Sequence, residues 1–180
     1  MASDTDLTQK RLQELLHYDP ETGVFTWLPR PVSRPFNCLW NAHYAGKQAG
    51  SISKSRGNLL YVKINMGGSI KSAHRLAFLY MTGEFPSTGV DHKDRNGLNN
   101  RWNNLRPANQ TENCANRGIS KKNTSGFKGV YLHKINRSYV ASIVIRGKRT
   151  HLGCFNSAEE AHSAYVVAAQ NYSGEFANGL

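Results

Sequence analysis

A carboxylate and an imidazole stand side by side at Asp91 and His92, and Asn113 follows after a run rich in Asn and Gly. Carboxylate and amide oxygens are hard ligands that suit Mg²⁺ or Mn²⁺. A histidine that is neutral near pH 7 can take a proton from water when a carbonyl or similar partner orients its other nitrogen. The residue types therefore predict hydrolysis of a phosphodiester, with a divalent cation on Asp91 and Asn113 and with His92 as the base.

Asp91 and His92 can serve one site only if their strand is irregular, because neighbours on a regular strand point to opposite faces. The residues that follow favour turns, so we expect the strand to end almost at once. They are Asn96, Gly97, Asn99 and Asn100. Asn104, expected on the second strand, would tie the loop through side-chain hydrogen bonds to the backbone. The alternative is an exposed polar hairpin without a catalytic role.

Short elements must hold this stretch in place. Leucines near one helical face predict a helix over residues 7–16. Residues 19–23 have the composition of a turn, and residues 24–27 alternate like a strand. Prolines predict a loop over residues 29–35, and residues 59–71 are typical of a hairpin.

Two helices would flank the Asp91–His92 stretch. Ser72 can cap a helix over residues 74–81 that ends at Gly83. His74 on that helix is a packed histidine, a phosphate contact or a transition-state stabiliser, and it counts among the candidate catalytic residues. A short helix over residues 111–116 would carry Asn113.

The chain is strongly basic, with 180 residues, a formal charge of +11 and a pI near 9.8. No Asp or Glu stands between Asn113 and Ala158. Because Lys and Arg displace the counterions condensed on nucleic acid, this balance predicts double-stranded DNA as the partner. An RNA-binding protein would show aromatic stacking motifs on a larger sheet, and the sequence has none.

The cysteines Cys38, Cys114 and Cys154 stand far apart without paired spacing. They predict neither a zinc knuckle nor a disulfide, and so no disulfide-linked partner. No apolar run has the length of a signal peptide or the ~18 residues of a membrane span. We therefore expect a cytoplasmic protein without a membrane partner, and the sequence leaves monomer and dimer open.

The last third of the chain alternates between short strands and tight turns. Strands are expected over residues 129–133, 139–145 and 150–155, and Ser157 with Glu160 forms a capping box for a helix. A three-stranded antiparallel sheet packed on one helix results. The fold class is thus α+β, with a first domain over residues 1–117, a linker over 118–125 and a second domain over 126–180.

Five fragments occur in order along the first domain: His74-Arg75-Leu76-Ala77, Val90-Asp91-His92-Lys93-Asp94, Asn99-Asn100-Arg101-Trp102, Asn104-Leu105-Arg106 and Glu112-Asn113. Together they resemble the HNH homing-endonuclease family of phages and mobile introns, whose fold is a ββα-metal hairpin and helix. The resemblance implies an HNH-type DNA endonuclease or nickase. It makes Asp91 and Asn113 the metal ligands, His92 the general base and Asn104 the asparagine that organises the loop.

Two further features belong to this resemblance. Asparagine stands where some members carry their last histidine, which favours Mg²⁺ or Mn²⁺ over Zn²⁺. Residues 18–27 are similar to the leader of phage members. The family therefore implies the host cell of a phage or mobile element as the place of action.

Residues 125–172 resemble the AP2 DNA-binding domain, which lays a three-stranded sheet in the major groove. The fragments are Ser125-Gly126-Phe127-Lys128-Gly129-Val130, Tyr139-Val140-Ala141, His151-Leu152-Gly153-Cys154-Phe155 and Ala158-Glu159-Glu160-Ala161. The matching positions that would face DNA are Lys128, Tyr131, His133, Tyr139, Ser142, Arg149 and His151, and the basic residues Arg137, Arg146 and Lys148 add to them. Strand alternation separates Tyr139 from Ser142 unless the strand bulges.

Two functions from different classes remain. One is a metal-dependent DNA endonuclease whose second domain aids the choice of site. The other is a non-catalytic DNA-binding regulator that retains a degenerate HNH hairpin. The presence of Asp91, His92 and Asn113 together favours the enzyme.

Overall fold

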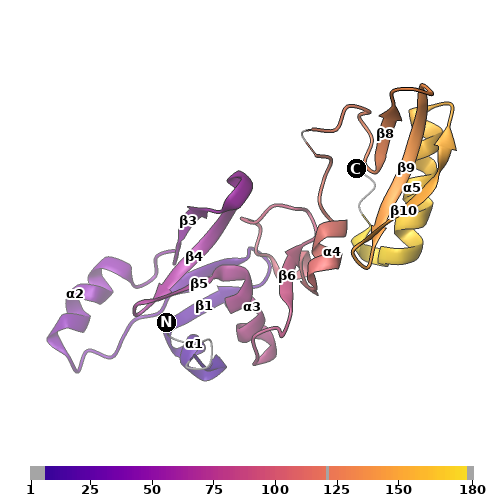
Figure 1. Ribbon diagram of the computed structural model, residues 1–180. Coiled ribbons are helices and arrows are strands. Elements are labelled where there is room, and N and C mark those ends of the chain that lie inside the picture. The colour runs from indigo at the N-terminus through magenta and orange to yellow at the C-terminus, as the bar shows by residue number, and fades with distance from the viewer. Residues whose placement is uncertain (1–6, 121, 178–180) are drawn as a thin grey trace. The chain divides into compact units, whose positions relative to one another are not determined.

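The computed structural model of the chain describes residues 7–120 and 122–177 (Figure 1). It is a mixed α+β structure with several small antiparallel sheets, which confirms the predicted class. The chain divides into two compact units, residues 1–107 and 108–180, and each is described by itself. Within the described part of the chain, no helix has the length and apolar character needed to cross a membrane.

The first unit combines short helices with three small sheets. Strands β1 and β2 pair with each other, β3, β4 and β5 form a three-stranded sheet, and β6 pairs with β7. In chain order the elements are α1 (Gln9–Leu15), β1 (Leu16–Asp19), β2 (Val24–Trp27), α2 (Pro35–Tyr44), β3 (Ser51–Lys54), the 3-10 turn η2 (Arg56–Asn58), β4 (Leu60–Met66), β5 (Ser69–Ser72), α3 (Ala73–Thr82), β6 (Gly89–His92), the 3-10 turn η3 (Trp102–Asn104) and β7 (Leu105–Ala108).

One hydrophobic core holds this unit together. Tyr18 and Phe25 stack with ring centroids 4.6 Å apart, and Leu76 of α3 is fully buried in the same cluster. The Thr8 side chain caps α1 by accepting a hydrogen bond from the Arg11 N–H. The core therefore joins α1, the β1–β2 hairpin and α3, which are the elements beneath the β6–β7 loop.

The expected loop is present over residues 29–34, but a helix that the sequence did not predict follows it directly. Helix α2 begins at Pro35, because proline is tolerated in the first turn of a helix, where its missing N–H costs nothing. Strand β3 was not expected either, and it pairs antiparallel with β4. The predicted hairpin over residues 59–71 is present as β4 and β5.

The second unit contains a three-stranded antiparallel sheet and one long helix. The strand order is β10-β9-β8, and α5 contacts all three strands. Its elements are α4 (Gln110–Ala115), β8 (Val130–His133), β9 (Ser138–Ile145), β10 (Lys148–Phe155), α5 (Ala158–Ser173) and the 3-10 turn η4 (Gly174–Phe176). The sheet, its turns and its helix lie where the sequence placed them.

Small residues let α5 approach the sheet closely. Ala161 packs against Val130 and Ala141, and Tyr165 packs against Ile143. Ser157 accepts a hydrogen bond from the Glu160 N–H at the start of α5. Residues 118–125, the expected linker, fall inside this second unit, so the division into functional domains at that linker stays a prediction.

Candidate active site at the β6–β7 loop

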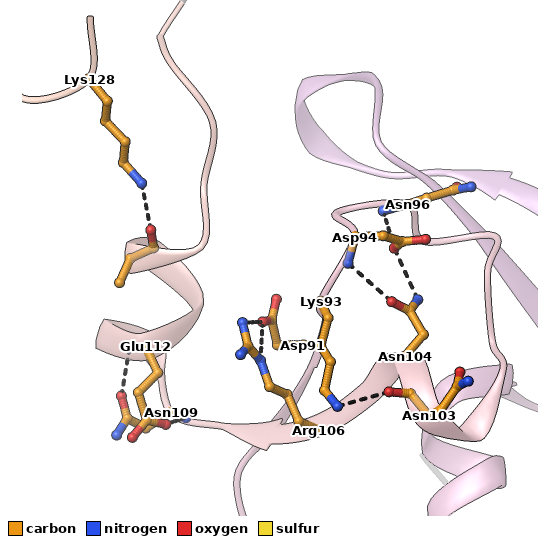
Figure 2. A network of polar contacts seen from close by, with 11 residues as sticks. Asp91, Lys93, Asp94, Asn96, Asn103, Asn104, Arg106, Asn109, Glu112 and Lys128 are labelled. Carbon is orange, nitrogen blue, oxygen red and sulfur yellow. Dashed lines mark hydrogen bonds and ion pairs between the residues drawn. The ribbon is translucent and has the colours of Figure 1, made fainter. Parts of the chain in front are cut away.

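Asp91 lies on β6 and pairs with Arg106 on β7. Arg106 donates from Nε, at 2.9 Å, and from Nη2, at 2.8 Å, to the same oxygen, Oδ2 of Asp91 (Figure 2). Only 6% of the Asp91 side chain and 8% of the Arg106 side chain are exposed. A buried carboxylate requires hydrogen bonds and an opposite charge, and Arg106 supplies both.

His92 follows directly and has a different partner. Its Nε2 lies 3.2 Å from Oδ1 of Asn100, and both residues are buried. Burial lowers the pKa of His92, although the Asn100 hydrogen bond and the charges of Asp94 and Asp91 act in the opposite direction. The imidazole is therefore neutral at pH 7, as a general base must be.

Strand β6 ends directly after Asp91 and His92. β6 stops at His92, and the Arg95 N–H donates to the His92 carbonyl oxygen in the turn that follows. Asp91 and His92 are each only 5% exposed, although they are neighbours on the chain. The predicted early end of the strand is confirmed, but Asp91 and His92 both still lie on β6, so a common site for the two side chains stays a prediction.

Asn104 ties the loop between β6 and β7. Its Nδ2 donates to Oδ1 of Asp94 at 3.0 Å and to the Asn99 carbonyl oxygen at 2.8 Å, and its Oδ1 accepts from the Asp94 N–H at 3.1 Å (Figure 2). Burial alone would raise the pKa of Asp94, but the hydrogen bonds from Asn99, Asn96 and Asn104 outweigh it and the pKa is lowered. Asn104 ends the η3 turn just before β7 and does not lie on the second strand.

Two glycines let other segments touch this loop. A Cβ on Gly97 would lie 2.3 Å from the Leu60 carbonyl oxygen, and one on Gly23 would lie 2.3 Å from the carbonyl carbon of Asn100. Gly23 also has a φ of 74°, which favours glycine. Strand β4 and the β1–β2 turn therefore support the loop by direct backbone contact.

His74 on α3 packs against the ring of His92. The ring centroids are 5.1 Å apart and nearly perpendicular, and Tyr61 contacts both rings. Burial, with smaller effects of His92 and Arg75, lowers the pKa of His74 to about 3. A ring that is neutral at pH 7 cannot contact phosphate as a cation, so this geometry favours packing among the three roles considered for His74.

Residues 71–115 match the HNH endonuclease family. The matched segment includes the expected site residues His74, Asp91, His92, Asn104 and Asn113. The predicted resemblance to HNH endonucleases is therefore supported for this segment.

A viral protein and one solved structure are similar over longer stretches. The uncharacterized HNH endonuclease L560 of Acanthamoeba polyphaga mimivirus is 37% identical over 107 residues, which are 58% of this chain and 54% of that protein. The chain thus spans about half the length of this curated relative. The solved structure, described as DNA binding and cleavage by the HNH homing endonuclease I-HmuI, aligns with 83% of this chain and with 76% of its own chain. The sequence identity is 20%, and the TM-score of 0.37 is too low to support an argument about the fold.

The donors of the HNH segment suit a hard cation. Among residues 7–120 and 122–177, no group of three or more His, Cys, Asp or Glu side chains could hold a metal ion. A cation at Asp91 would therefore need amide, water and phosphate oxygens as well, which Mg²⁺ and Mn²⁺ accept. The Asp91 carboxylate fits this set, although its Oδ2 already accepts both bonds from Arg106.

Asn113, the expected second ligand, lies on α4 in the second unit. Asn109 and Glu112 start this helix with a capping box, in which the Asn109 side chain accepts from the Glu112 N–H and Glu112 accepts from the Asn109 N–H (Figure 2). The helix expected over residues 111–116 is thereby present. Because Asp91 belongs to the first unit, shared coordination by Asp91 and Asn113 stays a prediction.

The β8–β10 sheet of the second unit has one face against α5 and one face away from it. Tyr139 packs with Val130 and Ala141 on the helix side. Because side chains alternate along a strand, Ser142 lies on the opposite face, here called the free face. The register shift that the sequence left open occurs in β10, between His151 and Gly153, and not in β9.

Five of the expected DNA-facing residues share the free face. Cross-strand pairs lie on the same side of a sheet, and the register pairs His151 with Ser142, Arg149 with Val144 and Tyr131 with Val140. The free face therefore carries Tyr131, His133, Ser142, Arg149 and His151. A cavity of about 710 Å³, lined by Tyr131, Ser142 and Arg149 together with Gln110 and Thr111 of α4, places α4 at the border of this face.

The other expected basic residues lie outside the free face. Arg137 and Arg146 occupy turns with φ of 51° and 48°, and Lys148 is the first residue of β10; all three are exposed. Lys128 is half-buried, and its Nζ donates to the Ala115 carbonyl oxygen at the end of α4 (Figure 2). A cation at a helix C-terminus is favourable, so Lys128 also has a structural role.

The sequence did not predict the hydrogen-bond partners of Asp91 and His92, which are Arg106 and Asn100. The sequence indicated Arg106 only as part of a family fragment, and Asn100 only as a turn former and as part of another family fragment. One signal for Arg106 was present, because a carboxylate expected at a closed site requires a cation on a neighbouring strand. No comparable signal existed for Asn100, whose amide meets His92 only through the path of the folded loop.

Proposed function

We propose that this chain is a metal-dependent DNA endonuclease of the homing type, which hydrolyses phosphodiester bonds. One observation carries the proposal: the buried Asp91–His92 pair at the end of β6 lies inside the segment that matches the HNH endonuclease family. Burying a carboxylate beside an imidazole costs free energy of solvation, which supports a role beyond the structure of the hairpin.

The residues divide the chemistry among them. Bound by Asp91 and Asn113, Mg²⁺ or Mn²⁺ would stabilise the charge that develops on the phosphate and on the leaving 3′ oxygen. His92 takes a proton from the water that attacks phosphorus, because its lowered pKa leaves it neutral at pH 7. Asn104 keeps the loop closed around these groups.

The second unit would read the DNA, in the manner of an AP2 domain. Its free face joins two histidines, a tyrosine and an arginine on a three-stranded sheet, with further arginines in the turns at its ends. The absence of Asp and Glu between Asn113 and Ala158 supports contact with phosphate. Tyr139 is left out of this surface because it packs against the helix side.

Cleavage of supercoiled DNA tests the proposal. The full chain should nick or linearise the DNA with Mg²⁺ or Mn²⁺ and not with EDTA. Asp91→Ala, His92→Ala and Asn113→Ala should each lower the rate by at least about 10²-fold, the usual contribution of a positioned base or ligand. His17→Ala, which changes an exposed histidine on β1, should leave the rate unchanged.

Two results would contradict the proposal. One is the absence of any metal-dependent product, and the other is undiminished cleavage by the Asp91 and His92 variants. Binding of DNA without cleavage would favour the regulator with a degenerate hairpin, and thermal unfolding of each variant would show whether lost activity is merely lost folding.

A further inference from the structure

We propose that Asn100 is a positioning residue that holds His92 with its proton on Nε2 and its lone pair on Nδ1, and that the β1–β2 hairpin holds Asn100. Nothing in the sequence suggested this role. The inference deepens the proposed function, because it names the atom of His92 that takes the proton from water.

The orientation of the Asn100 amide follows from its two contacts. Its Nδ2 donates to the Leu98 carbonyl oxygen at 3.3 Å, and its Oδ1 faces Nε2 of His92 at 3.2 Å. Turning the amide over would bring Oδ1 against the Leu98 carbonyl, and two acceptors repel each other. The Asn100 oxygen therefore faces the imidazole.

This orientation selects one form of the neutral imidazole. A neutral histidine carries its proton on one ring nitrogen, and only a protonated Nε2 can donate to the Asn100 oxygen. The lone pair must then lie on Nδ1. When Nδ1 takes a proton, Nε2 still donates to Asn100, so the hydrogen bond serves both the neutral and the charged ring.

The β1–β2 hairpin keeps Asn100 from moving. Tyr18 Oη donates to the Asn100 carbonyl oxygen at 2.6 Å, and Asn100 is only 2% exposed. Gly23 fits against the backbone of Asn100 without room for a Cβ. The Trp102 N–H donates to the Pro20 carbonyl oxygen at 2.9 Å, which fixes the chain on the other side.

The imidazole resonances of the full-length chain, labelled with ¹⁵N and kept in EDTA at pH 7.5, give the first test. Correlation of ring protons with ring nitrogens distinguishes the two tautomers, and His92→Gln identifies the His92 signals. We expect the tautomer protonated on Nε2. Asn100→Leu, which removes the acceptor, should give a mixture, whereas Asn100→Asp, which keeps an oxygen in place, should preserve the preference.

Cleavage kinetics give the second test. Asn100→Leu should lower kcat by about 10²-fold with little change in KM, because a misplaced base loses most of its contribution while DNA still binds. Tyr18→Phe removes only the hydrogen bond to the Asn100 backbone and should give a smaller loss. Asn103→Ala, which changes an exposed neighbour of the loop, should leave both the tautomer and kcat unchanged.

The outcomes separate this inference from the proposed function. If the chain cleaves DNA but His92 carries its proton on Nδ1, or if Asn100→Leu alters neither the tautomer nor kcat, the inference is wrong and the endonuclease stands. If the tautomer is as expected but the chain cleaves DNA with neither Mg²⁺ nor Mn²⁺, the positioning role of Asn100 holds and the endonuclease proposal fails. Should Asn100→Leu fail to fold, the tautomers of the unaltered chain and of Tyr18→Phe decide.

Discussion

Arg106 donates two hydrogen bonds, from Nε and Nη2, to a single carboxylate oxygen of Asp91, Oδ2. In a side-on bidentate pair the two bonds would be shared between both oxygens. The two bonds hold Oδ2 against the guanidinium, on the residue next to His92.

Removing Arg106 should destabilise the fold. Arg106→Met leaves the Asp91 carboxylate buried without its cation, so we expect a loss of about 3–5 kcal/mol in the free energy of unfolding. Urea denaturation measures it, with Arg101→Met at an exposed position as the control. Adding Asp91→Asn to Arg106→Met should recover part of the loss, and strictly additive effects would show that the two side chains do not interact.

Metal binding should stabilise the folded chain through Asp91. Millimolar Mg²⁺ is expected to raise the Tm, and EDTA to reverse the change, because an ion that binds only the folded state stabilises it by mass action. Asp91→Asn should abolish the shift, while Glu21→Gln, at an exposed position on the β1–β2 turn, should retain it. If Mg²⁺ raises the Tm of Asp91→Asn as much as that of the unaltered chain, the ion does not bind at Asp91.

Asn104→Ala should loosen the β6–β7 loop. The substitution removes three hydrogen bonds to Asp94 and Asn99, which at about 1 kcal/mol each gives a loss of about 2–3 kcal/mol. Asn103→Ala is the matched control, because Lys93 contacts only its backbone oxygen. If the two variants have equal stability in urea, the Asn104 side chain does not stabilise the loop.

The buried ring of His74 should make stability depend on pH. The unfolded chain protonates this histidine near 6.5, whereas the folded chain does so only near 3. Its contribution to stability is therefore complete above pH 6.5 and is lost as the pH falls toward 3, by about 2 kcal/mol between pH 6.5 and 5. His74→Phe should show a correspondingly smaller loss in urea denaturation over this range, and His17→Phe should behave like the unaltered chain.

Arg149→Ala should weaken DNA binding and reduce the salt dependence of the affinity. Loss of one phosphate contact lowers the slope of log K against log salt by about 1. Thr150→Ala, the next residue on β10, pairs with Ile143 on the helix side and should change neither quantity. The same slope for Arg149→Ala as for the unaltered chain would exclude this arginine from the DNA interface.

The sequence predicted those parts of the site that depend on local chemistry. Turn-forming residues after His92 required the strand to end there, and a capping residue with an acidic partner marked the start of α5. The partners of the catalytic pair were not predictable in this way. The β6–β7 pairing brings Arg106 to Asp91, and the path of the loop brings Asn100 to His92, so neither contact leaves a periodic pattern.

Two errors of detail have the same origin. Proline at position 35 indicated a loop, but its lack of an N–H is harmless in the first turn of α2. Tyr139 was included in the DNA-facing set because of a family match, although its own alternation with Ala141 already placed it on the helix side. In both cases a rule of position outweighed the cue that was used, because proline is tolerated in the first turn of a helix and alternation fixes the side of a strand residue.

The supports of the β6–β7 loop lie outside the segment that carries its family signature. Leu60 meets Gly97, and Tyr18 and Gly23 meet Asn100, yet the matched segment begins at residue 71. Grafting residues 71–115 onto another scaffold would transfer the reactive side chains without the backbone that sets their angles. The smallest portable piece of this site therefore starts at β1, and any attempt to recombine or shorten such proteins has to cut before Leu16.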